Sequence, residues 1–315
     1  MAGGNGPLVQ AIDPGSIDRA ARVLREGGLV AVPTETVYGL AARADRAEAV
    51  ARIYRAKGRP DFNPLIVHVP DLAAADRLAL FDDRARALAT ACWPGPLTLV
   101  LPLRPDAGLA AAVTAGLDTV ALRCPAHPAM QALLAATGLP LAAPSANRSG
   151  AVSPTRADHV AASLGERVDL ILDGGACAAG LESTIVALRG AGTWQVLRPG
   201  PLPESRISAI LGSSPHAVTS LAIEAPGQLA SHYAPGKPVR LEAREAQPDE
   251  FHIGFGVVAG DWNLSPSGDL GEAAANLYEA LHKSAGDARP RVAVAPVPHE
   301  GVGVAINDRL RRAAA

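Results

Sequence analysis

The chain has 315 residues, of which 48% are hydrophobic and 19% are charged, and its formal net charge is −2. This composition excludes a disordered chain, and it argues against a protein that grips nucleic acid by bulk charge. Its cysteines, Cys92, Cys124 and Cys177, are few and widely spaced, which is typical of neither a disulfide framework nor a zinc site. With no leader-like or membrane-spanning apolar run, the sequence favours the cytoplasm and no membrane contact.

Up to residue 212, short apolar runs alternate with helical stretches, and this alternation predicts an α/β domain around a large twisted sheet. We expect strands at Leu29–Pro33, Leu65–Val69, Leu97–Leu103, Thr119–Arg123, Leu139–Ala143, Leu170–Leu172, Ser183–Leu188 and Trp194–Leu197. We expect helices at Ile17–Glu26, Arg46–Lys57, Asp83–Cys92 and Pro128–Thr137. For the helix that ends at Lys57, Asp45 is the expected cap, Glu48 completes a capping box, and Gly58 is the expected stop.

The character of the chain changes after residue 212. Residues 213–237 are rich in Ser, Pro, Gly and Ala without a sustained period, which predicts a linker. A small βαβ-like unit follows, with strands at Val239–Leu241, Ile253–Val258 and Val292–Val297 and helices at Leu270–Ser284 and Val304–Arg312. We therefore expect a large α/β domain at 8–212, a linker at 213–237, and a small α/β domain at 238–315.

Several familiar motifs are missing from the sequence. It contains no GxxxxGK[ST] loop, no GxSxG elbow and no HExxH pair. A P-loop nucleotide site, a common hydrolase and a dedicated zinc centre are therefore not favoured. The commonest enzyme classes are therefore not favoured, but an enzyme of another class is not excluded.

Polar residues interrupt the apolar strand ends in four segments. They are PTETVYGL (33–40), KGRP with NPLIVH (57–60 and 63–68), APSANRSGAVSPT (143–155), and ESTIV with LRPG (182–186 and 197–200). Each has an ordinary explanation as a turn, a charged helix end or a buried histidine. Two of the segments are also suited to binding phosphate. Lys57 and Arg59 carry the cations of a phosphate clamp, and the loop 143–155 has hydroxyl and backbone N–H groups that can bind phosphate oxygens.

Taken together and in this order, these segments, with WPGPLTLVL and TVALRCPAHP, resemble the YrdC-type L-threonylcarbamoyladenylate synthase family over residues 10–212. The linker sequence SHYAP (231–235) and the tail APVPHEGVGVAINDRLRRAA resemble the longer, two-domain members. The resemblance implies an open twisted mixed sheet with flanking helices, plus a small Rossmann-like C-terminal domain. That domain carries no catalytic motif, so we expect it to dock a partner or support the lid.

The resemblance also implies a reaction. Members condense L-threonine, bicarbonate or CO2 and ATP into threonylcarbamoyl-AMP and pyrophosphate. A partner transferase then modifies the adenosine beside the anticodon of tRNA. ATP is a substrate. Mg²⁺ is expected because the ATP phosphates need a counterion, and no metal site formed by protein ligands is expected. A weak contact with tRNA or other double-stranded RNA is left open.

Matching positions carry the expected site residues. The central polar group is Lys57, Arg59, Ser145 and Asn147, with Ser145 and Asn147 positioning phosphates and Mg²⁺. The threonine pocket is Thr36, His68, Arg123, Ala143 and Ser183, with Arg123 on the carboxylate. The ATP contacts are Arg59, Asn63, Thr119, Ser145, Ser153, Arg198 and the lid residue Tyr233.

Two other interpretations stay open. One is an RNA-binding module with a basic surface formed by Arg52, Arg55, Lys57, Arg59 and Arg148. The other is a carbamoyl-handling relative from hydrogenase maturation, although the sequence lacks zinc-finger and acylphosphatase-like segments. Threonine-dependent turnover of ATP distinguishes the synthase from both.

Overall fold

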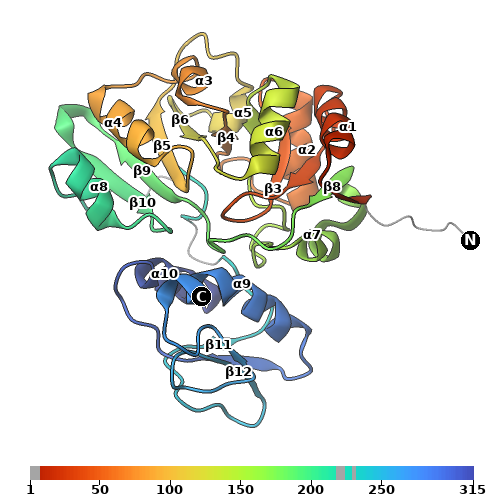
Figure 1. The fold of residues 1–315 in the computed structure, drawn as a ribbon, viewed down its shortest axis with the longest axis vertical. Coiled ribbons are helices and arrows are strands. Elements are labelled where there is room, and N and C mark those ends of the chain that lie inside the picture. Colours follow the sequence, from red (N-terminus) through yellow and green to blue (C-terminus); the bar gives the residue numbers. More distant parts are fainter. Residues whose placement is uncertain (1–7, 218–223, 229–231) are drawn as a thin grey trace, which may run out of the picture.

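The computed structural model describes residues 8–217, 224–228 and 232–315. Within those residues a ten-stranded mixed sheet has the order β1-β8-β2-β3-β7-β4-β6-β5-β9-β10, and a four-stranded parallel sheet has the order β11-β14-β12-β13. Figure 1 shows the smaller sheet in a separate unit, with helices α9 and α10 facing the larger one. These features confirm the expected fold class.

The strands of the larger sheet are β1 (Val9–Ala11), β2 (Val30–Val32), β3 (Gly39–Arg43), β4 (Ile66–His68), β5 (Leu97–Pro102), β6 (Thr119–Arg123), β7 (Leu141–Ala142), β8 (Leu170–Asp173), β9 (Thr184–Leu188) and β10 (Trp194–Arg198). The helices around it are α1 (Pro14–Arg25), α2 (Ala47–Lys57), α3 (Leu72–Asp76), α4 (Asp83–Cys92), α5 (Ala111–Thr114), α6 (Pro128–Thr137), α7 (Ala157–Leu164) and α8 (Glu204–Leu211). Short 3₁₀ turns cover Gly165–Arg167 and Gly190–Gly192. The smaller unit contains β11 (Val239–Arg240), β12 (Glu250–Gly254), β13 (Trp262–Asn263), α9 (Leu270–Gly286), β14 (Arg291–Val294) and α10 (Gly303–Ala313).

Both faces of the larger sheet are buried beneath helices. On one face, Val30 and Val32 of β2 pack with α1 and α6, and on the other Ala31 packs with α2 and its neighbours. This alternation follows from the two-residue period of a strand. Figure 1 shows α1 and α6 side by side above the sheet. The central strands are therefore fixed from both sides, and their ends are rigid supports for side chains.

Helix α2 confirms one part of its prediction and corrects another. Gly58 ends the helix in the left-handed conformation with φ 60°, as expected. The capping box is wrong, because the N-cap is Arg46 and it makes no side-chain cap hydrogen bond. The Asp45 carboxylate instead accepts from Arg43 Nε and Nη2 at 2.7 and 2.8 Å.

The segment PTETVYGL after β2 does contain a turn, which was its ordinary explanation, but the turn leads into a strand. It is a tight loop that leads into β3, which pairs antiparallel with β2. Thr34 Oγ1 accepts from the backbone N–H groups of Thr36 and Val37 at 3.2 Å, so a threonine does order the turn. The missed strand β3 is short and largely small residues, which carry a weak strand signal.

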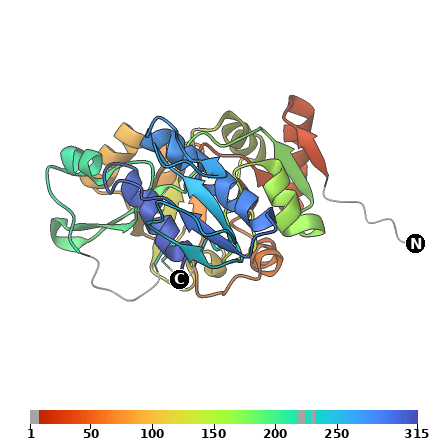
Figure 2. The same cartoon turned by 90° about the horizontal axis from the view of Figure 1, so that it is seen from below.

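The C-terminal unit places its helices against the larger domain. Strand β12 ends at Gly254, earlier than the predicted Val258, because residues 255–258 turn back on themselves through a bridge between Phe255 and Val258. Figure 2, seen from below, shows this unit lying across the middle of the larger domain. Throughout the described residues, every helix is too short or too polar to cross a membrane.

Candidate active site

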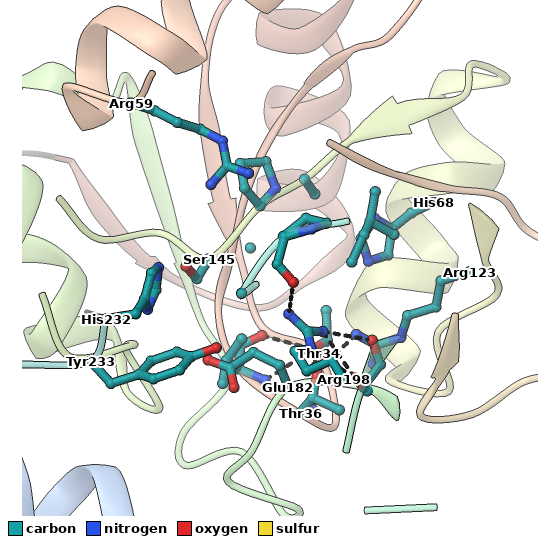
Figure 3. A pocket seen from close by; sticks show the side chains of 18 residues that line it. Thr34, Thr36, Arg59, His68, Arg123, Ser145, Glu182, Arg198, His232 and Tyr233 are labelled. Carbon is teal, nitrogen blue, oxygen red and sulfur yellow. Dashed lines mark hydrogen bonds between the residues drawn. The ribbon is translucent and has the colours of Figure 1, made fainter. Parts of the chain in front are cut away.

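A single small cavity gathers most of the polar strand ends. It is lined by Thr34, Thr36, Val37, Gly39, Arg59, Ile66, His68, Arg123, Ala143, Pro144, Ser145, Glu182, Ser183, Arg198, Pro226, Gly227, His232 and Tyr233. Figure 3 shows His68 and Arg123 on one side and Arg59, Ser145, His232 and Tyr233 on the other. Its free volume is about 40 Å³, which holds only a few water molecules.

We call Thr36, His68 and Arg123 the strand wall, because two of them end paired strands and the third is hydrogen-bonded to Arg123. His68 and Arg123 are register partners at the ends of the parallel strands β4 and β6. The Arg123 guanidinium donates from Nη1 to Thr36 Oγ1 at 2.8 Å, and Thr36 Oγ1 lies 2.8 Å from Thr34 Oγ1. Strand pairing thus places the arginine beside the imidazole, and the loop between β2 and β3 adds the hydroxyl of Thr36.

Glu35 balances the charge of Arg123. Its Oε1 lies 2.7 Å from Arg123 Nη2, and its Oε2 accepts from the Ala126 N–H at 3.0 Å. Burial alone would raise the pKa of Glu35, but the charge of Arg123 and the hydrogen bonds hold that pKa below its usual value. The ion pair fixes the Arg123 guanidinium at the cavity wall.

His68 is buried and its ring is electrically neutral near pH 7. Burial, reinforced by the nearby Arg123 charge, lowers the pKa of His68 to about 3. Its Nδ1 atom is buried without a hydrogen-bond partner within the described residues. An imidazole nitrogen in that state is available to a ligand.

Arg198 connects the strand ends to the linker. Its Nη2 donates to the Ser183 carbonyl at 2.9 Å and to Ser183 Oγ at 3.1 Å, and its Nη1 donates to the Pro226 carbonyl at 3.3 Å. Ser183 Oγ also lies 2.7 Å from Thr98 Oγ1. Because all the donors of a guanidinium lie in one plane, Arg198 fixes β9 and the linker relative to each other.

Arg59 and Lys57 lie at the end of α2 but in different settings. Arg59 lines the cavity and is held by the carbonyls of Asn63 (3.1 Å from Nε) and Pro64 (2.9 Å from Nη2). Burial lowers the pKa of Arg59 to about 10, so it remains a cation at neutral pH. Lys57 lies behind the cavity, where its Nζ donates to the carbonyls of Ser145 and Asn147, both at 2.6 Å.

We call Pro226, Gly227, His232 and Tyr233 the linker wall, because these residues close the cavity from the linker side. Tyr233 has a left-handed backbone, with φ 64°, and is fully buried. A Cβ on Gly227 would lie 2.9 Å from the Tyr233 hydroxyl and 2.9 Å from Arg198 Cδ, so this position accepts only glycine without a shift. Burial lowers the pKa of His232 to about 3, and its Nδ1 has no partner in the described part of the chain.

Glu182 is a carboxylate in the floor of the cavity. Its oxygens accept from Ser153 Oγ at 2.5 Å, from Tyr278 Oη at 2.8 Å and from Arg309 Nε at 2.9 Å. Burial opposes ionisation, yet the positive charges of Arg309 and Arg198 lower the pKa of Glu182 to about 2. Tyr278 and Arg309 belong to α9 and α10, so the C-terminal unit reaches the site.

The cavity brings together many of the residues predicted from the sequence. The predicted residues that line it are Thr36, Arg59, His68, Arg123, Ala143, Ser145, Ser183, Arg198 and Tyr233. The predicted residues that do not line it are Lys57, Asn63, Thr119, Asn147 and Ser153. Sequence reasoning missed Thr34, Glu182 and His232 as lining residues, although each stands inside a segment that the motifs had already marked.

Besides Lys57, three of the predicted residues outside the cavity have hydrogen-bond partners in the structure. The Asn147 amide nitrogen donates to the carbonyls of Arg148 and Ala151 at 2.9 and 2.8 Å, so it braces its own loop. Ser153 is bound to Glu182. The Asn63 carbonyl accepts from Arg59, and its Oδ1 is buried without a partner in the described structure.

Thr119 lies away from the cavity. It starts β6, whereas Arg123 ends it, and four residues of extended strand separate the two by about 13 Å. Thr119 pairs with Pro102 of β5. Its role as an ATP contact stays a prediction.

The basic surface of the RNA-binding alternative is also reduced. Lys57 and Arg59 are 3% and 8% exposed, so neither contributes to an outer surface. Arg52 is paired with Asp169 at 2.8 Å. Arg55 and Arg148 remain exposed.

Comparisons with known proteins show the family of the chain. Residues 22–200 match the Sua5/YciO/YrdC family model, described as "Telomere recombination", and residues 202–315 match "Threonylcarbamoyl-AMP synthase, C-terminal domain". The threonylcarbamoyl-AMP synthase of Bacillus subtilis is 41% identical over 96% of this chain and 93% of its own length. The synthase of Pyrococcus abyssi is 38% identical over 96% of this chain and 95% of its own length.

Solved structures agree in fold. The crystal structure of P. abyssi Sua5 complexed with L-threonine matches with a TM-score of 0.87 and 36% identity, covering 98% of this chain and 96% of that one. Escherichia coli YciO matches with a TM-score of 0.53 and 25% identity, covering 61% of this chain and 94% of its own. HypF of T. kodakarensis, at 20% identity and a TM-score of 0.53, shares the fold alone.

Proposed function

This chain belongs to the Sua5/YrdC family of threonylcarbamoyl-AMP synthases, and from that premise we propose that the cavity in Figure 3 is its active site. There the enzyme, a nucleotidyltransferase, condenses L-threonine, bicarbonate or CO2 and ATP into threonylcarbamoyl-AMP and pyrophosphate. The observation that carries the assignment is the convergence of buried Arg59, Arg123 and Arg198 on one cavity. Buried arginines suit substrates that bring a carboxylate and a triphosphate.

The strand wall is the threonine subsite. Arg123, held by Glu35, binds the threonine carboxylate, and the Thr36 hydroxyl adds a hydrogen bond. The neutral His68 offers its unpartnered Nδ1 to the amino or hydroxyl group. Ala143 and Ser183 complete the walls around the short side chain.

The nucleotide side lies beneath the linker wall. Arg59, Arg198 and the Ser145 loop face the phosphates, and Tyr233 covers them. Lys57 and Asn147 act here through that loop, because Lys57 Nζ holds the Ser145 carbonyl and the Asn147 amide holds the chain that follows. Asn63 supports Arg59, and Ser153 supports Glu182.

The chemistry needs two bond-forming steps. The threonine amine attacks CO2, or bicarbonate with loss of water, and gives up a proton as the N–C bond forms. A carbamate oxygen then attacks the α-phosphorus of ATP, the bond to the β-phosphate oxygen breaks, and pyrophosphate leaves. Arg59 and Arg198 stabilise the charge that develops on the phosphates. A closed, dry site protects the labile carbamate.

The closed state must open to admit ATP. The free volume of about 40 Å³ is far below the several hundred Å³ that a nucleotide needs. We assign opening to the linker wall, since Tyr233 and His232 come from the linker rather than from the sheet. This supports Tyr233 as the lid residue.

Mg²⁺ does not fit as a metal held by this protein. Among the described residues, no cluster of His, Cys, Asp or Glu offers a site, and Glu182 is already bound by Arg309. The Asn147 side chain is used within its own loop. Mg²⁺ prefers carboxylate and water oxygens, so it enters as the complex with ATP, and no step is assigned to it here.

The remaining assignments rest on the family. The product passes to a transferase that modifies tRNA in the cytoplasm, and the exposed Arg55 and Arg148 offer at most a weak contact with RNA. The catalytic domain spans 8–212, the linker 213–237 and the C-terminal domain 238–315. Within the linker, residues 218–223 and 229–231, including Ser231 of the SHYAP motif, lie outside the described residues.

Pyrophosphate release by the purified chain tests the proposal. With ATP and Mg²⁺, we expect release that requires both L-threonine and bicarbonate. Arg59→Met should lower kcat/KM by about 100-fold or more, whereas Arg55→Met, which replaces an exposed arginine in the last turn of the preceding helix α2, should not change it. Release that ignores threonine would assign another acceptor, and RNA binding without release would favour the binding-module alternative.

A further inference from the structure

The C-terminal unit supplies one side chain to the active-site region that has no obvious structural need to be charged. Arg309 of α10 is 0% exposed, and its Nε donates to Glu182 Oε2 at 2.9 Å. Its Nη1 donates to Asp308 Oδ2 at 2.7 Å, and its Nη2 is buried without a hydrogen-bond partner in the described structure. Burying an arginine this completely is costly, so its partner matters.

That partner, Glu182, lines the cavity that we propose as the nucleotide site. Glu182 lines the cavity beside Arg198 and below Tyr233. ATP brings a triphosphate into the same space, and an uncompensated carboxylate would repel it strongly where water is excluded. Arg309 supplies the opposing charge at 2.9 Å, from the side away from the cavity.

The same guanidinium also contacts the linker wall. Its central carbon lies 5.3 Å from the centre of the Tyr233 ring, and that ring stacks on Tyr278 at 5.6 Å. Tyr278 in turn donates to Glu182. Arg309, Tyr278 and Glu182 thus form one buried cluster under the ring that covers the cavity.

We propose that Arg309 is a positioning residue of the nucleotide site: it neutralises Glu182 and seats Tyr233, so that the C-terminal domain completes the ATP-binding face. This inference rests on the proposed function. It gives the C-terminal domain an electrostatic role in catalysis, in addition to any docking role. Arg309 itself touches no reacting atom.

The charge argument makes a specific prediction for two variants. Arg309→Met keeps the apolar stem but removes the cation in direct contact with Glu182, so the dissociation constant of a non-hydrolysable ATP analogue and the KM for ATP should rise by at least about tenfold. The KM for threonine should change by less than about threefold. Glu182→Gln combined with Arg309→Met removes both charges and should recover most of the lost ATP affinity.

A matched control comes from the same domain. Arg289 stacks over Phe251 at 5.0 Å and pairs with Asp261 and Asp287 far from the cavity, and Arg289→Met should leave ATP affinity unchanged. Circular dichroism and thermal melting of each variant confirm that it is folded.

The outcomes separate the inference from the function. If the double variant binds the analogue no better than Arg309→Met, or if threonine KM rises in parallel, Arg309 merely holds the domains together and the inference falls. If Arg309→Met binds like the unmodified chain, the inference also falls while the proposed function stands. If the unmodified chain binds no nucleotide and releases no pyrophosphate, both fall.

Discussion

The two walls of the cavity are built by different physical means. In the strand wall, the register of β4 with β6 sets the positions of His68 and Arg123, and each strand is fixed by neighbours on both sides. In the linker wall, Tyr233 has a left-handed backbone and is held mainly by ring contacts with Tyr278, Arg309 and His232. The first wall is preorganised by the sheet, and the second is assembled from two domains.

This difference indicates how the enzyme divides its tasks. A rigid subsite suits a small amino acid that must be distinguished by a few polar contacts. An assembled subsite suits ATP, which is too large to enter the closed cavity. A substitution in the strand wall should therefore abolish threonine recognition, whereas a substitution in the linker wall should weaken ATP binding only partly.

Arg123→Lys should have the largest effect, because lysine keeps the charge and loses the planar fork. We expect the KM for threonine to rise by about 100-fold, with ATP-analogue binding nearly unchanged, as measured by pyrophosphate release and equilibrium binding. Arg43→Lys, in the surface pair with Asp45, is the matched control and should behave like the unmodified chain. An equal loss of ATP binding in Arg123→Lys would show that the two walls are not separable.

Gly227→Ala should have a smaller effect, on the nucleotide side. The added Cβ meets Arg198 and the Tyr233 hydroxyl at 2.9 Å, so closure is hindered and the KM for ATP should rise by about tenfold. Gly236→Ala is the control, since Gly236 has a similar φ of 79° but no atom within 4 Å of the added Cβ. If both variants lose ATP affinity alike, backbone strain rather than wall geometry is responsible.

The smallest expected effect is a pH dependence of stability. The pKa values of His68 and His232 are both lowered to about 3 from 6.5. Between these values the unfolded chain binds more protons than the folded one, so stability falls as the pH is lowered from 6.5. His68→Asn should remove on the order of 1 kcal/mol of the loss between pH 6.5 and 5.5, measured by denaturant unfolding.

His232→Asn should remove less of that loss than His68→Asn. The linker wall can open locally, which exposes His232 to protons without global unfolding. Equal flattening of the pH dependence in the two variants would indicate that the walls open together. That result would contradict the division into a rigid and an assembled wall.

Much of the strand wall was accessible from the sequence, and the linker wall was accessible only in part. Apolar runs that end in polar residues marked the segments that contain Thr36, His68 and Ser183. The family resemblance then identified these three residues, and Arg123, as candidates for the threonine pocket. The sequence could not show which polar side chains already make their hydrogen bonds within the protein and are therefore not free to bind a ligand. Lys57 and Asn147 look like ligands for phosphate, yet their donors are bound to backbone carbonyls.

The missed contacts depend on distant parts of the chain. Arg309 lies 127 residues from its partner Glu182, and no local pattern links the two. The helix cap predicted at residue 45 failed for a local reason, because the Asp45 carboxylate accepts from Arg43, two residues earlier, and does not cap the helix. Local spacing predicts which elements form, and competition among side chains decides what each residue then binds.

A backbone hydrogen bond of the linker affects how fast the enzyme can release its product. The His232 N–H donates to the Arg312 carbonyl near the end of α10 at 3.1 Å. A single side chain changes rotamer within nanoseconds, whereas the linker wall is hydrogen-bonded to the C-terminal domain and moves on the slower timescale of a domain. Uncovering the product then displaces that unit through water, and solvent friction sets its speed. Sucrose or glycerol should accordingly slow multiple turnovers in proportion to viscosity while leaving a single chemical turnover almost untouched.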